Sequence, residues 1–168
     1  MKIDHSYLEN FEYKHKNPYH DRLEEFSNFV FRDTEAEKLK GKWNQSYFKN
    51  DSPIVVEIGC GYGEFMQQYC TDFPHKNYIG IDYRFKRSFS LAKRLNEIQN
   101  SNFCLLRAKG ERVSHLFGEN EINELLYFFP DPWPKKRHQK KRLFQKQFLN
   151  EAFKVLRPGG KMFIKTDH

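Results

Sequence analysis

An acidic residue between two prolines is followed by a run of cations in the segment FFPDPWPKKRHQKKR, residues 128–142. Pro130 and Pro132 restrict the backbone on either side of Asp131, which favours a rigid loop that holds the carboxylate in one direction. A fixed carboxylate beside an aromatic ring, here Trp133, can accept hydrogen bonds from the N–H edge of a stacked nucleobase. The cations that follow can neutralise the phosphates that flank such a base. The segment therefore predicts a nucleic-acid site, and the alternative is a stiff turn followed by a solvated helix start.

The positive charge of the chain is concentrated in the same segment. The chain has 29 Lys and Arg against 22 Asp and Glu, a formal charge of +7, and residues 135–142 alone contain six Lys or Arg together with His138. A concentrated basic patch attracts a polyanion, although charge alone does not identify which one.

A second stretch, EIGCGYG, has the pattern of a cofactor-binding turn and begins at Glu57. Gly59, Gly61 and Gly63 follow a β-branched run, and glycines there let the backbone turn tightly and approach a ligand closely. Glu64 stands where the dinucleotide fingerprint needs a small residue, and two carboxylates make a pyrophosphate ligand unfavourable. S-adenosylmethionine, which carries an ammonium and a sulfonium, suits the stretch better; the alternative is a glycine turn that only packs a helix on a strand.

Alternating strands and helices must position these two groups, and they begin near residue 53. Runs of β-branched and aromatic residues predict strands at residues 54–59, 77–82, 103–108, 124–129 and 161–167. Apolar residues at helical spacing predict helices at about residues 64–71, 85–98, 113–117 and 140–156. Strand and helix in alternation predict an α/β fold, Rossmann-like, with a mostly parallel sheet covered by helices on both faces.

Four acids stand at or just past the ends of predicted strands: Glu57, Asp82, Asp131 and Asp167. In such sheets ligands bind beyond the carboxyl ends of the strands, so this edge is the predicted active site. Asp82 ends the second predicted strand and can accept hydrogen bonds from both hydroxyls of a ribose. Each acid alone could be a turn former or a helix cap, but the four together favour a site.

Together the motifs EIGCGYG, GIDYR, FFPDPWPKKRHQKKR and KTD resemble the bacterial tRNA (guanine-N7)-methyltransferase family over about residues 53–168. The resemblance implies a Rossmann-like class I methyltransferase that transfers a methyl group from S-adenosylmethionine to N7 of a guanine in the tRNA variable loop. It implies that Asp131 is catalytic and that the cofactor is bound by Glu57, Gly59, Gly61, Gly63, Asp82 and Lys109. It implies substrate contacts at Lys135, Arg137, His138, Lys140, Lys141, Arg142 and Asp167.

The chain departs from the family pattern at both ends and after its third predicted strand. The family usually has Asp or Asn at the position of Lys109, so Glu111 or a backbone N–H is an alternative contact for the adenine. The chain ends after the fifth predicted strand, and we expect a methyltransferase domain over residues 53–168 that lacks the family's last strands. Residues 1–52 are polar and aromatic and are predicted to form an N-terminal arm with a short helix.

Several other classes of protein are disfavoured. No apolar run is long enough to cross a bilayer and the first residues have no signal-peptide pattern, so we expect a cytoplasmic protein. The cysteines form no CxxC pair, and the arm histidines His5, His15 and His20 lack ligand spacing, so we expect neither a disulfide nor a metal site. The remaining alternatives are an amino-methylating enzyme acting on adenine or cytosine, a dinucleotide oxidoreductase, and an RNA-binding protein without activity.

Overall fold

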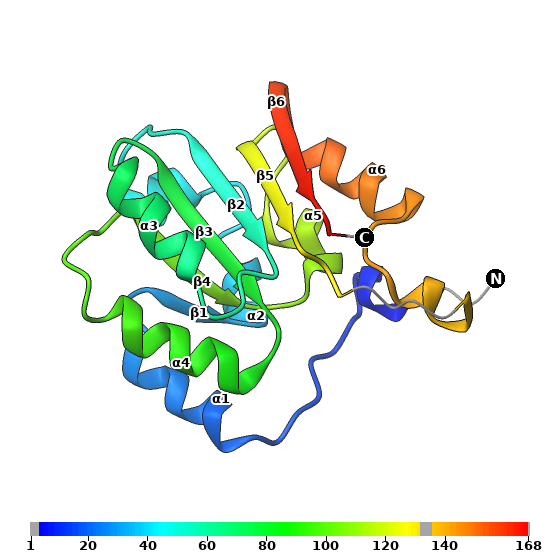
Figure 1. Ribbon diagram of the computed structural model, residues 1–168, viewed down its shortest axis with the longest axis horizontal. Helices are drawn as coiled ribbons and strands as arrows, with labels where there is room; N and C mark the ends of the chain where they lie inside the picture. Colours follow the sequence, from blue (N-terminus) through cyan, green and yellow to red (C-terminus); the bar gives the residue numbers. More distant parts are fainter. Residues whose placement is uncertain (1–3, 132–135, 168) are drawn as a thin grey trace.

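The computed structural model describes residues 4–131 and 136–167 and places six strands in one sheet, in the order β1-β4-β3-β2-β5-β6 (Figure 1). Each neighbouring pair of strands is parallel. The strands are β1 (Val30–Arg32), β2 (Ile54–Ile58), β3 (Asn77–Asp82), β4 (Phe103–Arg107), β5 (Ile122–Phe128) and β6 (Leu156–Lys165).

Helices precede, connect and cover these strands. The α-helices are α1 (Pro18–Arg22), α2 (Thr34–Glu37), α3 (Glu64–Asp72), α4 (Phe85–Leu95), α5 (Val113–Leu116) and α6 (Lys146–Val155). Short 3-10 turns are η1 (His5–Tyr7), η2 (Leu23–Phe26), η4 (Gly110–Arg112) and η5 (Lys136–Lys141), and η3 (Trp43–Phe48) is a π-helical turn. No helix in the described part of the chain is long and apolar enough to cross a membrane.

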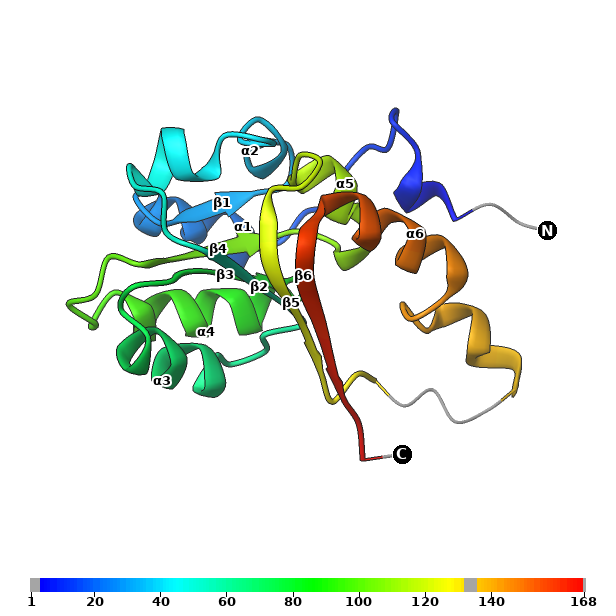
Figure 2. The same ribbon diagram turned by 90° about the horizontal axis from the view of Figure 1, so that it is seen from above.

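The sheet is the middle layer of three, with a hydrophobic core on each face (Figure 2). One core lies between the sheet and α2, α5 and α6, and includes Trp43 and Phe148. The other lies between the sheet and η2, α3 and α4, and includes Met66 and Leu91. The five residues of β2 are all buried, as expected for a central strand of a parallel sheet covered on both faces. This confirms the predicted α/β architecture.

The first fifty residues contribute more to the sheet than the sequence analysis anticipated. Strand β1 was not predicted, and Val30 pairs with Leu105 at the start of a parallel ladder with β4. The segment also supplies α1, η2 and the predicted short helix α2. The sheet therefore includes residues from both sides of residue 52, and a domain boundary at that position stays a prediction.

The predicted helix over residues 140–156 is shorter in the structure. Residues 136–141 form the 3-10 turn η5, and α6 begins only at Lys146. The Gln145 side chain donates hydrogen bonds to the carbonyls of Gln139 and Arg142, which ends the 3-10 turn. Leu143 packs against Gly110 in the intervening turn. The cations at residues 140–142 therefore precede the helix instead of lying on it.

The order of the strands places a topological switch point between β2 and β5. From β2 the chain proceeds to β3 and β4 on one side, and it returns to the other side with β5 and β6. Ligands of open α/β sheets bind at the carboxyl ends of the strands beside such a point.

Candidate cofactor and substrate site

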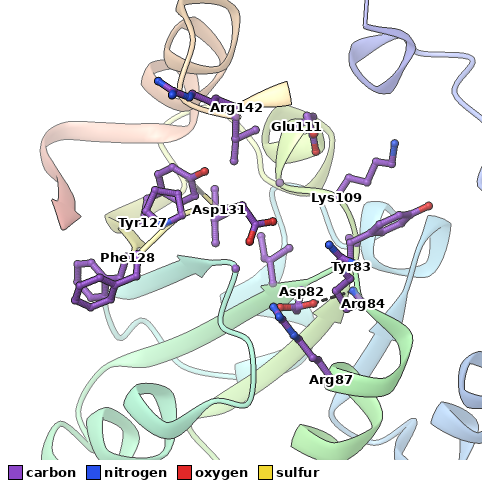
Figure 3. Close-up of a pocket in the computed structure, with 18 of the residues that line it drawn as sticks. Asp82, Tyr83, Arg84, Arg87, Lys109, Glu111, Tyr127, Phe128, Asp131 and Arg142 are labelled. Atoms are coloured by element: carbon purple, nitrogen blue, oxygen red, sulfur yellow. Dashed lines mark hydrogen bonds between the residues drawn. The ribbon is translucent and has the colours of Figure 1, made fainter. Parts of the chain in front are cut away.

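A cavity of about 660 Å³ opens at the carboxyl ends of the central strands (Figure 3). Among its lining residues are six of those that the family resemblance implied to be catalytic, cofactor-binding or substrate-binding, namely Gly59, Asp82, Lys109, Asp131, Lys141 and Arg142. Tyr83, Phe85 and Glu111 also line the cavity, and Arg84 and Arg87 border it from the start of α4. The cavity lies beside the switch point, where the acids were expected to gather.

The glycine turn and Asp82 form one connected unit. The Gly61 N–H donates to Asp82 Oδ2 at 3.0 Å, and the Arg84 N–H donates to Asp82 Oδ1 at 2.7 Å. Burial raises the pKa of the Asp82 carboxyl, and these two backbone hydrogen bonds oppose that shift. Gly59 has a φ of 77°, and a Cβ added there would meet no atom within 4 Å. The turn therefore leaves open space beside an oriented carboxylate.

Gly63 has a different role from Gly59. Its φ is 71°, but a Cβ at this position would collide with Leu91 Cδ1 of α4. Gly63 is also not among the residues that line the cavity. Because Gly63 has no side chain, α3 can pack closely on α4.

Glu57 lies behind the turn and does not line the cavity either. Its side chain is buried, and Glu57 Oε2 accepts a hydrogen bond from the Tyr78 hydroxyl at 2.7 Å. Burial raises the pKa of the Glu57 carboxyl, and the bond from Tyr78 partly offsets this. In this structure Glu57 packs beneath the glycine turn and supports it.

Asp131 follows β5 and projects into the space that Asp82 also borders (Figure 3). Between β5 and Asp131, Phe129 has a φ of 45° and donates its N–H to the Lys165 carbonyl of β6 at 2.8 Å. Burial raises the pKa of the Tyr127 hydroxyl to about 12, and the charges of Glu111 and Asp131 add to the shift. The charges of Glu111 and Asp131 therefore both act on the part of the cavity near the Tyr127 hydroxyl.

Lys109 lines the cavity but its ammonium is bound elsewhere. Lys109 Nζ donates to Ser6 Oγ at 2.8 Å and lies 4.9 Å from the centre of the Phe11 ring. Figure 3 shows the side chain extending away from Asp82. Glu111, by contrast, is largely enclosed, and its burial raises the pKa of its carboxyl.

The basic segment reaches the cavity through its last two residues. Lys141 and Arg142 line the cavity on the side of Leu143, whereas Arg137 is exposed and is not among the lining residues. Asp167 is exposed just beyond β6 and is not a lining residue. Trp133 and Lys135 lie outside the described residues, as do the side chains of His138 and Lys140.

The cavity wall formed by Tyr83 and Phe85 was not identified from the sequence. Their rings hold the guanidinium of Arg107, which lies 4.1 Å and 4.0 Å from the two ring centres. Arg107 is fully buried and pairs with Asp33. The only sign of this wall in the sequence was the spacing of the aromatic residues after Asp82, which is equally typical of the buried face of a helix. Cys60, Cys70 and Cys104 are buried and unpaired.

Comparison with solved structures identifies the fold. The chain is similar to a 16S rRNA (adenine(1408)-N(1))-methyltransferase from Catenulisporales acidiphilia, with a TM-score of 0.54 and 18% identity over 78% of this chain and 54% of that chain. A similar match, with a TM-score of 0.53 and 18% identity, covers 81% of this chain and 68% of the antibiotic-resistance methyltransferase Kmr. The chain therefore has the Rossmann-like methyltransferase fold.

Comparison with protein families and with curated sequences identifies the family. Residues 51–168 match the family described as "Putative methyltransferase". The chain is 38% identical to the tRNA (guanine-N(7)-)-methyltransferase of Christiangramia forsetii over 92% of this chain and 66% of that protein. It is 34% identical to the enzyme of the same name from Oenococcus oeni, over 87% of this chain and 67% of that protein. The chain belongs to the tRNA (guanine-N(7)-)-methyltransferase family, and it spans about two thirds of the length of these relatives.

Proposed function

We propose that this chain transfers a methyl group from S-adenosylmethionine to N7 of a guanine in the variable loop of tRNA. The observation that carries the proposal is the cavity at the carboxyl edge, where Asp82 and Asp131 border one space that Lys141 and Arg142 also line. Asp82 is proposed to bind the cofactor, Asp131 the target guanine, and the two cations the phosphates of the tRNA.

The residues of the cavity fit S-adenosylmethionine. Its volume of about 660 Å³ lies within the range of small-molecule sites. Each oxygen of Asp82 accepts one backbone N–H, which leaves each a lone pair for a ribose hydroxyl. The open space at Gly59 lets the backbone approach the ligand, and Glu111 is better placed than Lys109 for the adenine, because Lys109 is bonded to Ser6. When bound, the cofactor supplies an electrophilic methyl group on a sulfonium.

Guanine N7 has a lone pair and no proton, so its reaction with a methyl donor requires no base to uncover the nucleophile. The work of the protein is to align the base and to stabilise the positive charge that develops on the purine. The Asp131 carboxylate can do both by accepting a hydrogen bond from guanine N1–H or from the amino group. Asp131 is therefore proposed to be the catalytic residue.

The tRNA is proposed to be held by the basic segment. Lys141 and Arg142 are placed to neutralise phosphates beside the target base, and Arg137 can extend that contact along the backbone. Lys135, His138, Lys140 and Asp167 remain proposed substrate contacts on the basis of the motif. Because tRNA is the substrate, we propose a cytoplasmic location.

The variant Asp131→Asn tests the role of this carboxylate. We expect S-adenosylmethionine affinity within about twofold of wild type, since Asp82 and the glycine turn are intact, and a fall in turnover of about 10²-fold or more. The affinity is measured by calorimetry and the turnover with an unmodified tRNA transcript. The matched control is Asp51→Asn, an exposed acid before β2 at the opposite edge of the sheet. Equal turnover in the two variants would remove Asp131 from the mechanism.

A further inference from the structure

Two histidines of the first segment and an aspartate after β1 come together beside the sheet. The carboxylate oxygen Asp33 Oδ2 lies 2.9 Å from His20 Nε2 and 3.4 Å from His15 Nε2. The two imidazole ring centres are 3.8 Å apart. One ligand atom from each of the three residues lies within 4.8 Å of the others, and the side chains are only 15%, 15% and 9% exposed. Sequence spacing gave no sign of this cluster.

Neighbouring groups orient two of the three side chains. Asp33 Oδ1 accepts a hydrogen bond from Arg107 Nη1 at 2.6 Å, which turns Oδ2 toward the histidines. His20 Nδ1 lies 3.7 Å from Asp21 Oδ1, so a carboxylate stands behind this imidazole. Metal-binding histidines and carboxylates are usually held by such outer partners. His15 Nδ1 is buried and has no hydrogen-bond partner within the described part of the chain.

We propose that His15, His20 and Asp33 bind a divalent metal ion of the zinc type, with the imidazole nitrogens and Asp33 Oδ2 as ligands. Two imidazoles and one carboxylate are a donor set that suits Zn²⁺ and Co²⁺. Ligand atoms at about 2.1 Å from a tetrahedral metal are about 3.4 Å from one another. The His15–Asp33 distance of 3.4 Å already matches, and the His20–Asp33 distance of 2.9 Å must widen by a few tenths of an ångström.

The buried guanidinium of Arg107 sets the expected strength of the site. It binds the oxygen of Asp33 that faces away from the histidines, so it does not occupy the metal position. Its positive charge nevertheless weakens the binding of a cation nearby. We therefore expect weaker metal binding than at a site with the same three ligands and no such neighbour.

A metal ion here would join the first segment to the wall of the cavity. The His15 and His20 rings lie 5.4 Å and 6.1 Å from the ring of Phe85, which lines the cavity. Asp33 follows β1 at the edge of the sheet, whereas His15 precedes α1 and His20 belongs to it. The ion would thus fix α1 against β1, a stabilising role that is separate from methyl transfer.

Titration of the chelator-treated chain with Co²⁺ tests this site, because tetrahedral Co²⁺ absorbs strongly in the visible region. We expect one Co²⁺ per chain, displacement by Zn²⁺, and a rise in the melting temperature with either ion. His15→Ala and His20→Ala should each weaken Co²⁺ binding at least tenfold. The matched control His75→Ala removes an exposed histidine between α3 and β3 and should leave the titration unchanged.

Either of two results would overturn the proposal. Visible absorption no stronger than that of aqueous Co²⁺ at millimolar concentration, or equal binding by wild type and His20→Ala, would mean that the three residues form only a hydrogen-bonded cluster around Asp33 and Arg107. If the alanine variants fold poorly by circular dichroism, His20→Gln keeps most of the side-chain volume and should show the same loss of Co²⁺. None of these readouts requires cofactor or tRNA, so the result is independent of the proposed methyl transfer.

Discussion

The substitution Gly63→Ala separates a packing role for this glycine from a role in binding the cofactor. Gly63 has a φ of 71°, and an added Cβ would collide with Leu91 Cδ1 and lie 3.0 Å and 3.1 Å from Leu91 Cδ2 and Cγ. Leu91 is fully buried on α4, so a shift of its side chain must be accommodated within the packed core. Alanine at this position therefore combines backbone strain with overpacking.

The expected loss of stability follows from these two contributions. A non-glycine residue in the left-handed region costs about 1–2 kcal/mol, and overpacking of a buried site costs about 1–3 kcal/mol. Their sum is about 2–5 kcal/mol. Unfolding entropy of about 2.1 cal/mol/K per residue gives about 0.35 kcal/mol/K for this chain, so the melting temperature should fall by about 6–14 °C.

Gly59→Ala is the matched control, because Gly59 has nearly the same backbone conformation, with a φ of 77°, but nothing within 4 Å of an added Cβ. It should incur the strain alone, a fall of about 3–6 °C. Its methyl group, however, enters the cavity and should weaken S-adenosylmethionine binding. Gly63→Ala should bind the cofactor with wild-type affinity in calorimetry at a temperature where the variant is folded.

A double substitution tests whether the collision with Leu91 causes the additional loss of stability in Gly63→Ala. In a Leu91→Ala background the collision is absent, so Gly63→Ala should cost only the strain of about 1–2 kcal/mol. The same full cost in both backgrounds would refute the packing argument. Weakened cofactor binding by Gly63→Ala alone would instead restore Gly63 to the cofactor site.

Two further predictions concern charge. Burial raises the pKa of Glu57 above 4.5, so the stability that this carboxyl contributes is full below pH 4.5 and is lost as the pH rises through the raised pKa. The melting temperature of Glu57→Gln should therefore increase relative to that of wild type as the pH of the cofactor-free protein rises. A difference in melting temperature that stays constant with pH would contradict this. Lys141→Ala with Arg142→Ala should weaken tRNA binding and reduce the slope of log affinity against log salt by about 1.5–2. The control pair Lys42→Ala with Lys49→Ala, both exposed and remote from the cavity lining, should leave that slope unchanged, and an equal change in both pairs would mean that binding is not localised at the cavity.

The strands that carry the site were predictable because each is a buried run of β-branched or aromatic residues between turn signals. Strands β2 to β5 agree with their predicted ranges within two residues, and the expected edge is where the cavity lies. Strand β1 was not predicted, because three residues are too few for a pattern to emerge. Its place depends on the long-range ladder with β4 and on the pair between Asp33 and Arg107.

Side-chain roles were less predictable than strands, because identical residue types serve different purposes. Gly59 and Gly63 both need left-handed backbone, yet only the approach of Leu91 distinguishes the packing glycine. Lys109 follows β4 as the motif requires, but its ammonium is bound by Ser6, more than a hundred residues away in the sequence. The cluster of His15, His20 and Asp33 likewise depends on folding of the first segment onto the sheet.

The proposed activity of this chain is methylation of guanine N7 in tRNA. The most direct test is mass spectrometry of the nucleosides from an unmodified tRNA transcript incubated with the chain and S-adenosylmethionine, with Asp131→Asn as the paired reaction. We predict 7-methylguanosine in the wild-type reaction and a reduction of about 10²-fold or more with the variant. A methylated adenosine or cytidine, or no methylated nucleoside from a chain that binds both cofactor and tRNA, would contradict methylation of guanine N7 by this chain.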